Sequence, residues 1–252
     1  MPTWESGDHR LLQSLESALR HAGQRAGRWL LCRPGCAECC LGPFPITELD
    51  AWRLRRGLQR LMDEDPQRAV RILERARRVV EAMSGDFPGD RQTGLLWDEA
   101  PDQDGFFERH AAMPCPLLDP LSQLCELYAY RPISCRTFGL PVRIGEENLP
   151  PCRLCFQGAE ARQIEACRVT VDPEGLEDAL LREIGEGQTL IAWALLRVVG
   201  PAQPPWSSRS TSPACSGSPK PAEASDPQGS SGTDSPPAQS GLHAPHGEPP
   251  GS

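Results

Sequence analysis

The chain contains 252 residues, of which 38% are hydrophobic, so one or two domains with a moderately large core are feasible. Its formal net charge of −8 argues against nucleic acid and acidic lipid surfaces as partners. The first 24 residues lack the apolar run of a secretory signal, and residues 189–199 fall short of the roughly 18 apolar residues of a membrane span. We therefore expect a cytoplasmic protein that binds neither nucleic acid nor membrane.

Apolar residues at intervals of three or four predict helices in the N-terminal half. A first helix is expected around residues 12–22, with Ser6 or Asp8 as its cap. A second begins after Thr47, a residue type that caps helices well, and a third covers residues 66–83 and opens on a proline. The arginines of the third helix alternate with glutamates, which favours a solvated face over a nucleic-acid-binding stripe.

The middle of the chain is less regular. Residues 84–114 are rich in Gly, Asp and Pro and are expected to form a long loop, in which segments 94–100 and 105–113 pack back onto the core. Residues 165–171 predict a short strand. Two closing helices, each ending at a glycine, are expected within residues 172–185 and 187–200.

Composition changes after Gly200. Residues 201–252 are mostly Pro, Ser and Gly with almost no large aliphatic residue, so this tail is predicted to be disordered. Cys215 lies in it and is expected to be an incidental exposed thiol. Residues 1–200 are expected to form one domain of mainly α class, with irregular loops and a short hairpin.

Ten of the eleven cysteines precede the tail. Spacings of two or three residues let neighbouring thiolates converge on one ion or cluster, because the loop between them closes at little backbone cost. Thiolates are soft ligands that suit zinc and iron–sulfur clusters. The candidate metal ligands are Cys32, Cys36, Cys39 and Cys40, then Cys115, Cys125 and Cys135, and finally Cys152, Cys155 and Cys167.

Core packing, disulfide bonding and dithiol catalysis account for these cysteines less well than metal ligation does. Isolated buried cysteines are common, but core packing does not produce ten of them in clusters. Disulfides are rare in cytoplasmic proteins. Cys36 and Cys39 have the spacing of a catalytic dithiol, yet no strand–helix–strand pattern surrounds them. Together with Cys32 they also have the spacing of a radical-SAM cluster motif, but the repeated strand–helix units of that class are missing.

The cysteine motifs resemble the bacterial CxxCxxCC family of YkgJ-type cysteine-cluster proteins, described as a putative zinc- or iron-chelating domain. The resemblance covers about residues 30–170 and rests on CRPGCAECC, CPLLD and LCELYAYRPISCRTFGLP. The first gap holds three residues where the family name has two. The family implies chelation in the cytoplasm and no established reaction. A flagellin lysine methylase carries a similar cluster, so an enzyme is associated with the motif.

Three polar residues near the cysteines have open roles. Arg131 and Arg136 flank Cys135, where they either offset the negative charge of thiolates or simply lie at the surface. His110 is the histidine nearest the clusters and is expected to be solvated, with nitrogen ligation as the alternative.

We therefore expect a metal-binding protein folded around a cysteine metal centre over a motif core of about residues 30–170. It chelates zinc or iron, and an iron–sulfur cluster is one form that the iron can take. Ten thiols exceed one four-coordinate site, so either two sites exist or some thiols lie outside the coordination shell. The alternatives are an iron–sulfur-dependent redox or protein-modifying enzyme of methylase type, and a structural-zinc interaction module. The sequence shows no catalytic motif. The partner that it indicates is the metal ion or cluster, and it identifies no protein partner.

Overall fold

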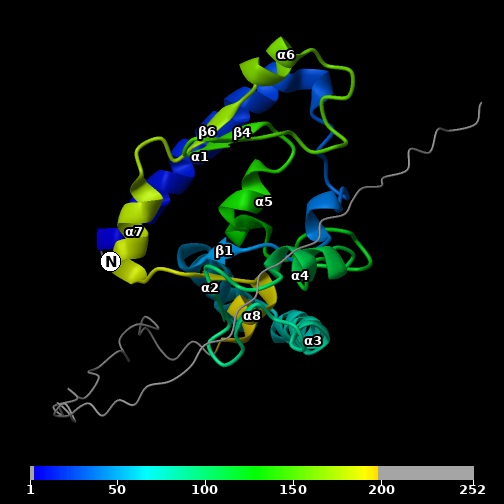
Figure 1. Ribbon diagram of the computed structural model, residues 1–252, viewed down its shortest axis with the longest axis vertical. Coiled ribbons are helices and arrows are strands. Elements are labelled where there is room, and N and C mark those ends of the chain that lie inside the picture. The colour runs from blue at the N-terminus through cyan, green and yellow to red at the C-terminus, as the bar shows by residue number, and fades with distance from the viewer. Residues whose placement is uncertain (1–2, 198–252) are drawn as a thin grey trace, which may run out of the picture. The chain divides into compact units, whose positions relative to one another are not determined.

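The computed structural model describes residues 3–197. The predicted tail at 201–252 and the predicted end of the last helix at Gly200 lie outside these residues. Within the described part, eight α-helices and seven short strands follow one another along the chain (Figure 1), which confirms the mainly α fold.

Three helices pack around one hydrophobic core. They are α2 (Glu48–Glu64), α3 (Pro66–Met83) and α8 (Ile191–Leu196), and Leu54 and Ile72 are fully buried between them. Burying such a side chain contributes roughly 1.5–3 kcal/mol relative to leaving it exposed. We refer to this as the α2 core.

Two caps fix where these helices begin. Thr47 caps α2 as predicted, because its hydroxyl accepts a hydrogen bond from the N–H of Asp50 at 3.3 Å. Asp65 caps α3 by accepting from the N–H of Arg68 at 3.1 Å. Each cap satisfies one of the backbone donors that a helix leaves unpaired at its N-terminus.

A second hydrophobic core lies along the N-terminal helix. Helix α1 (Thr3–Ala26) runs beside α7 (Leu176–Ile184), as Figure 1 shows, and α6 (Ala161–Ala166) packs near its other end. Leu11 and Leu180 are buried in this contact, which we call the α1 core.

A third cluster surrounds the stacked rings of Phe87 and Trp193, whose centroids are 4.1 Å apart; Phe106, Met83 and Leu190 also belong to it.

The strands form two small sheets. The first has the order β1–β7–β3–β2 with antiparallel pairing, and consists of Ile46–Thr47, Gln188–Thr189, Leu95–Leu96 and Gly89–Asp90. The second has the order β5–β4–β6 and consists of Glu147–Leu149, Val142–Ile144 and Val169–Val171. Strands β4 and β5 form an antiparallel hairpin, as expected, and β6 lies within the predicted strand 165–171.

Three of the predictions about the elements are wrong. The last closing helix does not run to a glycine: strand β7 occupies Gln188–Thr189, and α8 ends at Leu196, after which Arg197 is extended. Residues 84–114 are not one long loop, because they contain β2, β3 and helix α4 (Gln103–Arg109). Phe106 is fully buried and gives α4 an apolar face, so the expectation that segments of this region pack back is confirmed. Helix α1 begins at Thr3, well before residue 12. Asp8 therefore lies inside α1 and does not cap it.

Asp8 belongs to a buried ionic network. The guanidinium of Arg53 on α2 lies 2.5 Å from a carboxylate oxygen of Asp8 and 2.5 Å from one of Asp50. The carboxylate of Asp50 also accepts a hydrogen bond at 3.1 Å from the N–H of Ile133, where helix α5 (Ile133–Thr137) starts. Arg53 thus joins α1 to α2, and its partner Asp50 joins α2 to the start of α5.

Glu177 on α7 sits next to this network, and its ionisation gives the first prediction. Burial raises the pKa of Glu177 to about 7, and the charge of Asp50 adds to the rise. The folded chain then holds a proton that the unfolded chain releases, so this contribution to stability is complete below about pH 4.5 and is lost as the pH rises through about 7. Between about pH 5 and pH 8 the natural chain should lose roughly 2–3 kcal/mol more stability than Glu177→Gln.

Denaturant unfolding at both pH values checks this expectation. Glu183→Gln removes a carboxyl from the exposed side of the same helix and serves as the control, which should keep the pH dependence of the natural chain. Equal pH dependence in the Glu177→Gln variant and the natural chain would refute it.

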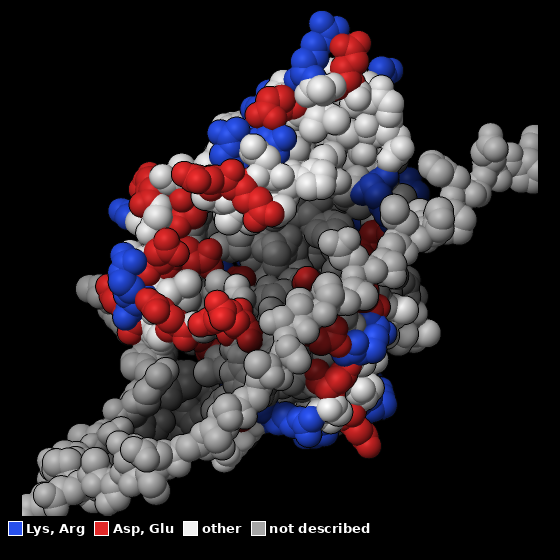
Figure 2. Space-filling view, in the orientation of Figure 1, with Lys and Arg blue, Asp and Glu red and all other residues white. Residues whose placement is uncertain are grey.

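Basic and acidic side chains are mixed over the face drawn in Figure 2, and carboxylates gather beside α7. Within residues 3–197, no helix combines the length and the apolar character that a bilayer crossing requires.

Candidate metal centres

The cysteine-rich run at residues 32–40 folds into consecutive tight turns. The N–H of Cys36 donates to the carbonyl of Arg33 at 3.0 Å, and the N–H of Cys40 donates to the carbonyl of Ala37 at 2.8 Å. These turns make the run compact, so that successive thiols meet different neighbours.

The end of this run pairs with the segment that carries Cys115. The N–H of Cys115 donates to the carbonyl of Cys40, and the N–H of Gly42 donates to the carbonyl of Met113, both at 2.8 Å. This short antiparallel ladder brings together two cysteines that are far apart in the sequence.

A second short ladder folds Cys125 back toward Cys115. Leu118 and Cys125 form an antiparallel bridge, and the N–H of Glu126 donates to the carbonyl of Leu117 at 2.9 Å. Cys115 and Cys125 both pack against the α2 core. The backbone therefore fixes three cysteines on one side of the domain, next to that core.

Cys135 reaches the same place from helix α5. Pro132 precedes the helix in an extended conformation, with ψ of 158°, and the carboxylate of Asp50 accepts from the next N–H, that of Ile133. Pro132 therefore directs the extended chain into α5. It delivers Cys135 from the first turns of a helix that is anchored to α2.

Cys152 and Cys155 lie on a turn against the other core. The N–H of Cys155 donates to the carbonyl of Cys152 at 2.8 Å, and the N–H of Phe156 donates to the carbonyl of Trp29 at 2.8 Å. Cys155 is 4% exposed and belongs to the α1 core. The bond to Trp29 holds this turn next to the start of the cysteine-rich run.

Four thiols gather on this side, because Cys36, Cys152 and Cys155 all neighbour Cys32. We call them the first thiol group. Burial raises the pKa of Cys32 to about 12, and the nearby charges of Cys155, Cys36 and Cys152 add to the rise. The thiol of Cys32 donates to the carbonyl of Phe138 at 3.7 Å.

Five thiols neighbour one another on the α2 side: Cys39, Cys40, Cys115, Cys125 and Cys135. We call them the second thiol group. Burial raises the pKa of Cys115 to about 12, and the charges of Cys125 and Cys39 add to this. Burial likewise raises the pKa of Cys125 and of Cys135.

The adjacent pair in the second thiol group ionises unequally. A hydrogen bond from Cys40 lowers the pKa of Cys39 to about 7, and the guanidinium of Arg131 helps to lower it. The same hydrogen bond raises the pKa of Cys40, together with burial and the charges of neighbouring thiols. Cys39 is therefore the thiol of this group that becomes a thiolate most readily.

The two arginines beside Cys135 have different roles. Arg131 is the cation near the thiols, because its charge lowers the pKa of both Cys39 and Cys125, although other causes are larger. Arg136 is buried and turned to other partners: it donates to Glu16 at 2.6 Å and to the backbone carbonyls of Arg131 and Ala129.

Two other sequence candidates lie apart from both groups. His110 hydrogen-bonds to Asp86 at 3.0 Å and packs on the ring of Phe106. Cys167 follows α6, is 3% exposed and packs in the α1 core. It is not among the main charges that shift the pKa of Cys32 or of the five thiols on the α2 side.

The donor atoms suit a soft metal. Among residues 3–197, no three Cys, His, Asp or Glu side chains converge at coordination distance, so the grouping rests on which thiols neighbour one another. Burying several thiols together disfavours their thiolate forms, as the raised pKa values of Cys32 and Cys115 show. A bound cation reverses this effect, since a coordinating thiol loses its proton outright. Thiol donors of this kind fit zinc and iron.

A mainly α fold that gathers nine free thiols in this way defines a cysteine-rich metal-binding protein. The comparison with family models agrees: residues 31–155 match the CxxCxxCC family, described as "Putative zinc- or iron-chelating domain". The chain belongs to this family through that domain. No curated protein and no solved structure matched the chain.

Gly139 is a residue of the site that the sequence did not single out, although it lies within the motif LCELYAYRPISCRTFGLP. Its φ is +105°, and a Cβ there would lie 2.5 Å from the sulfur of Cys32. Gly139→Ala should therefore push Cys32 out of place. Gly145→Ala is the matched control, since Gly145 also has a positive φ, of +57°, but faces open space.

We expect Gly145→Ala to cost about 1 kcal/mol of stability through backbone strain alone. Gly139→Ala should cost about 1–3 kcal/mol more and should weaken metal binding at the first thiol group, because the added methyl overlaps the sulfur of Cys32, a candidate ligand. Denaturant unfolding and metal analysis of both variants test this. Equal losses in the two variants would show that contact with Cys32 is unimportant.

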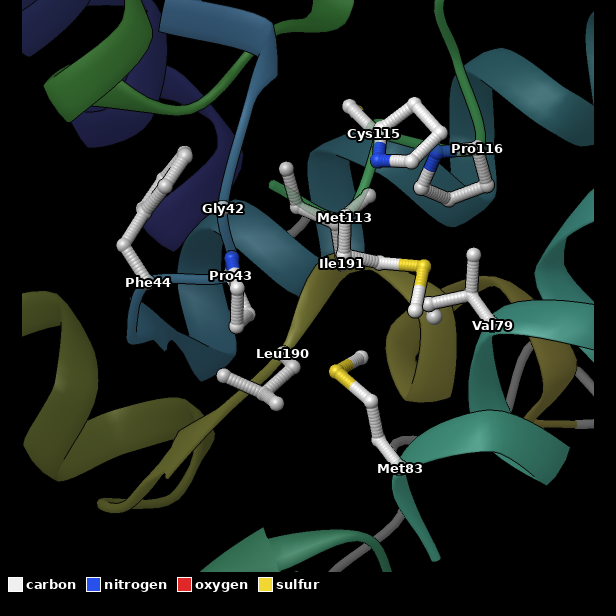
Figure 3. Close-up of a pocket in the computed structure, with 12 residues that line it drawn as sticks. Gly42, Pro43, Phe44, Val79, Met83, Met113, Cys115, Pro116, Leu190 and Ile191 are labelled. Carbon is white, nitrogen blue, oxygen red and sulfur yellow. The ribbon is translucent and has the colours of Figure 1, made fainter. Parts of the chain in front are cut away.

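A cavity of about 330 Å³ borders Cys115 and helix α3, and two further cavities adjoin the thiols. One of about 20 Å³ lies beside Cys115, where the thioethers of Met83 and Met113 point toward its middle (Figure 3). It has room for about one water molecule. The other has a volume of about 630 Å³ and is lined by Cys39, Cys135 and Cys152. The second cavity touches both thiol groups and is large enough for a ligand.

Proposed function

We propose that the chain is a cytoplasmic protein that holds zinc or iron at two separate cysteine centres. One observation carries the proposal: nine thiols divide into a group of four and a group of five, and each group rests on a different hydrophobic core. All ten cysteines in the described range are free thiols, the form that a reducing compartment maintains.

The first thiol group supplies as many ligands as a closed structural site needs. Four thiolates complete the tetrahedral shell of zinc or hold one iron–sulfur cluster. Cys32 and Cys36 come from one end of the domain sequence and Cys152 and Cys155 from the other. A metal held there joins distant segments, so its binding energy also contributes to folding.

The second thiol group has one thiol more than a four-cysteine centre uses. Arg131 provides a positive charge next to Cys39 and Cys125, which stabilises the negative charge of thiolate ligands. Within this proposal, one of the five thiols lies outside the coordination shell at any time and is available for hydrogen bonding or ligand exchange.

The cavity of about 630 Å³ favours a second candidate, an iron–sulfur-dependent redox or protein-modifying enzyme. A closed zinc site has no open coordination position, whereas a cavity lined by Cys39, Cys135 and Cys152 would let a ligand reach the centres. An iron–sulfur cluster would supply electron transfer there. The residues of this chain would bind and orient the ligand and exclude water.

Anaerobic purification followed by metal analysis, acid-labile sulfide analysis and a visible spectrum tests both candidates. Brown protein that contains iron and sulfide supports the enzyme. Colourless protein that carries only zinc supports chelation and eliminates the iron–sulfur enzyme. Protein that holds neither zinc nor iron after expression with both metals would contradict the two-centre proposal.

A further inference from the structure

The larger cavity lies between the two thiol groups. Its lining includes Cys39 and Cys135 from the second thiol group and Cys152 from the first. A volume of about 630 Å³ falls within the range of roughly 300–1,000 Å³ that is typical of ligand pockets. A molecule in this cavity would therefore contact thiols of both groups at once.

The rest of the lining is mainly apolar, and part of it is unusually exposed. Leu41, Phe138 and Ile144 line this cavity and remain 49%, 47% and 46% exposed. Large apolar side chains gathered around one opening mark a binding site. Pro43, Pro45, Pro150 and Pro151 also belong to the lining, and their rings restrict backbone movement, so the cavity is largely preformed.

The charges of the lining cancel each other. Glu38 and Arg153 are its charged residues within the described part of the chain, and they pair at 2.6 Å. Glu38 precedes Cys39 and Arg153 follows Cys152, so this ion pair connects the two walls. Apart from the thiols, the described lining therefore offers no free charge that could compensate the hydration that a charged ligand loses.

We propose that this cavity binds a small, uncharged and mainly apolar molecule directly beside Cys39, Cys135 and Cys152. The inference rests on the proposed function in one respect: the thiols that the ligand touches are taken to be metal ligands. It names the class of ligand for that site. Phosphates, amino acids and other ionic metabolites are excluded from the class.

The test compares octanol, octylamine and octanoate, which share one alkyl chain and differ in the charge of the head group. Calorimetric titration into the metal-bound full chain should show that octanol binds at least about tenfold more tightly than either charged analogue. In the cobalt-substituted protein, octanol should also shift the cobalt absorption bands, because it lies next to thiolate ligands.

Ile144→Asp places a charge on the cavity wall and should abolish octanol binding without changing the metal content. Leu41→Asp tests the opposite wall in the same way. Leu121→Asp makes the same change at a side chain that is 93% exposed and is not part of the lining, so it should bind octanol normally.

Each outcome decides something. Equal affinity for the three compounds, no octanol binding at all, or unchanged binding in both wall variants would overturn the proposal. If octanol binds but leaves the cobalt absorption bands unmoved, the ligand does not lie beside the thiols. Metal analysis of the same samples tests the two centres separately, because calorimetry detects octanol binding whether or not the metal assignment is correct.

Discussion

Replacing Cys39 and Cys40 together with serine should strip the metal from the second thiol group and lower the melting temperature by more than about 10 °C. Structural zinc contributes roughly 10–16 kcal/mol of binding energy at pH 7, whereas a whole domain is stable by about 5–15 kcal/mol. The loss of one centre is therefore comparable to the entire stability of the domain. Metal analysis and thermal unfolding measure the two effects.

The division into two groups makes this prediction sharper. The double variant Cys32→Ser with Cys155→Ser should lose only the metal of the first thiol group. The double variant Cys39→Ser with Cys40→Ser should lose only the metal of the second thiol group. Cys167→Ala is the control, because it changes a buried thiol outside both groups and should keep the full metal content. Unchanged metal content and melting temperature in the Cys39/Cys40 variant would show that the adjacent cysteines are not ligands.

Replacing Arg53 with alanine should destabilise the domain by about 3–5 kcal/mol, the cost of breaking a buried ion pair by removing one partner. Arg53 is 2% exposed and pairs with Asp8 and Asp50, so its removal leaves two buried carboxylates without their cation. Denaturant unfolding gives the loss directly.

The same variant should also weaken metal binding at the second thiol group. Asp50 holds the first N–H of α5, the helix that carries Cys135, so disturbing Asp50 loosens the position of a candidate ligand. Arg60→Ala is the control: Arg60 makes an exposed pair with Glu64, a type of pair worth about 0–1 kcal/mol. If Arg53→Ala lowers the stability no more than Arg60→Ala does, the buried network contributes little to the stability of the domain.

Local signals in the sequence predicted local structure well. Thr47 caps α2 and the proline at residue 66 opens α3, because a cap or a first-turn proline acts within a few residues of the chain. Helix α4 was not predicted, since seven residues hold too few helical repeats to stand out, and its stability depends on burying Phe106 against distant residues.

The candidate site shows the same contrast. The sequence identified every thiol in both groups and predicted either two sites or some thiols outside the coordination shell. It could not divide the run at residues 32–40 between two groups, because that division depends on backbone pairing of Cys40 with Cys115 and on the contact of Phe156 with Trp29. Cys167 has no other cysteine at short spacing in the sequence, and its burial in the α1 core does not separate it from Cys155, which lies in the same core.

The two thiol groups are nested along the chain. Every residue of the second group, from Cys39 to Cys135, lies inside the segment that the first group closes between Cys36 and Cys152. Closing the outer segment first means joining ends about 116 residues apart, but once the inner centre has formed, the effective loop is only about 20 residues. The difference in loop entropy is about 1.5 kcal/mol, or roughly tenfold in affinity. If both groups bind metal as proposed, the order of the cysteines along the chain favours cooperative loading, with the inner centre filled before the outer one.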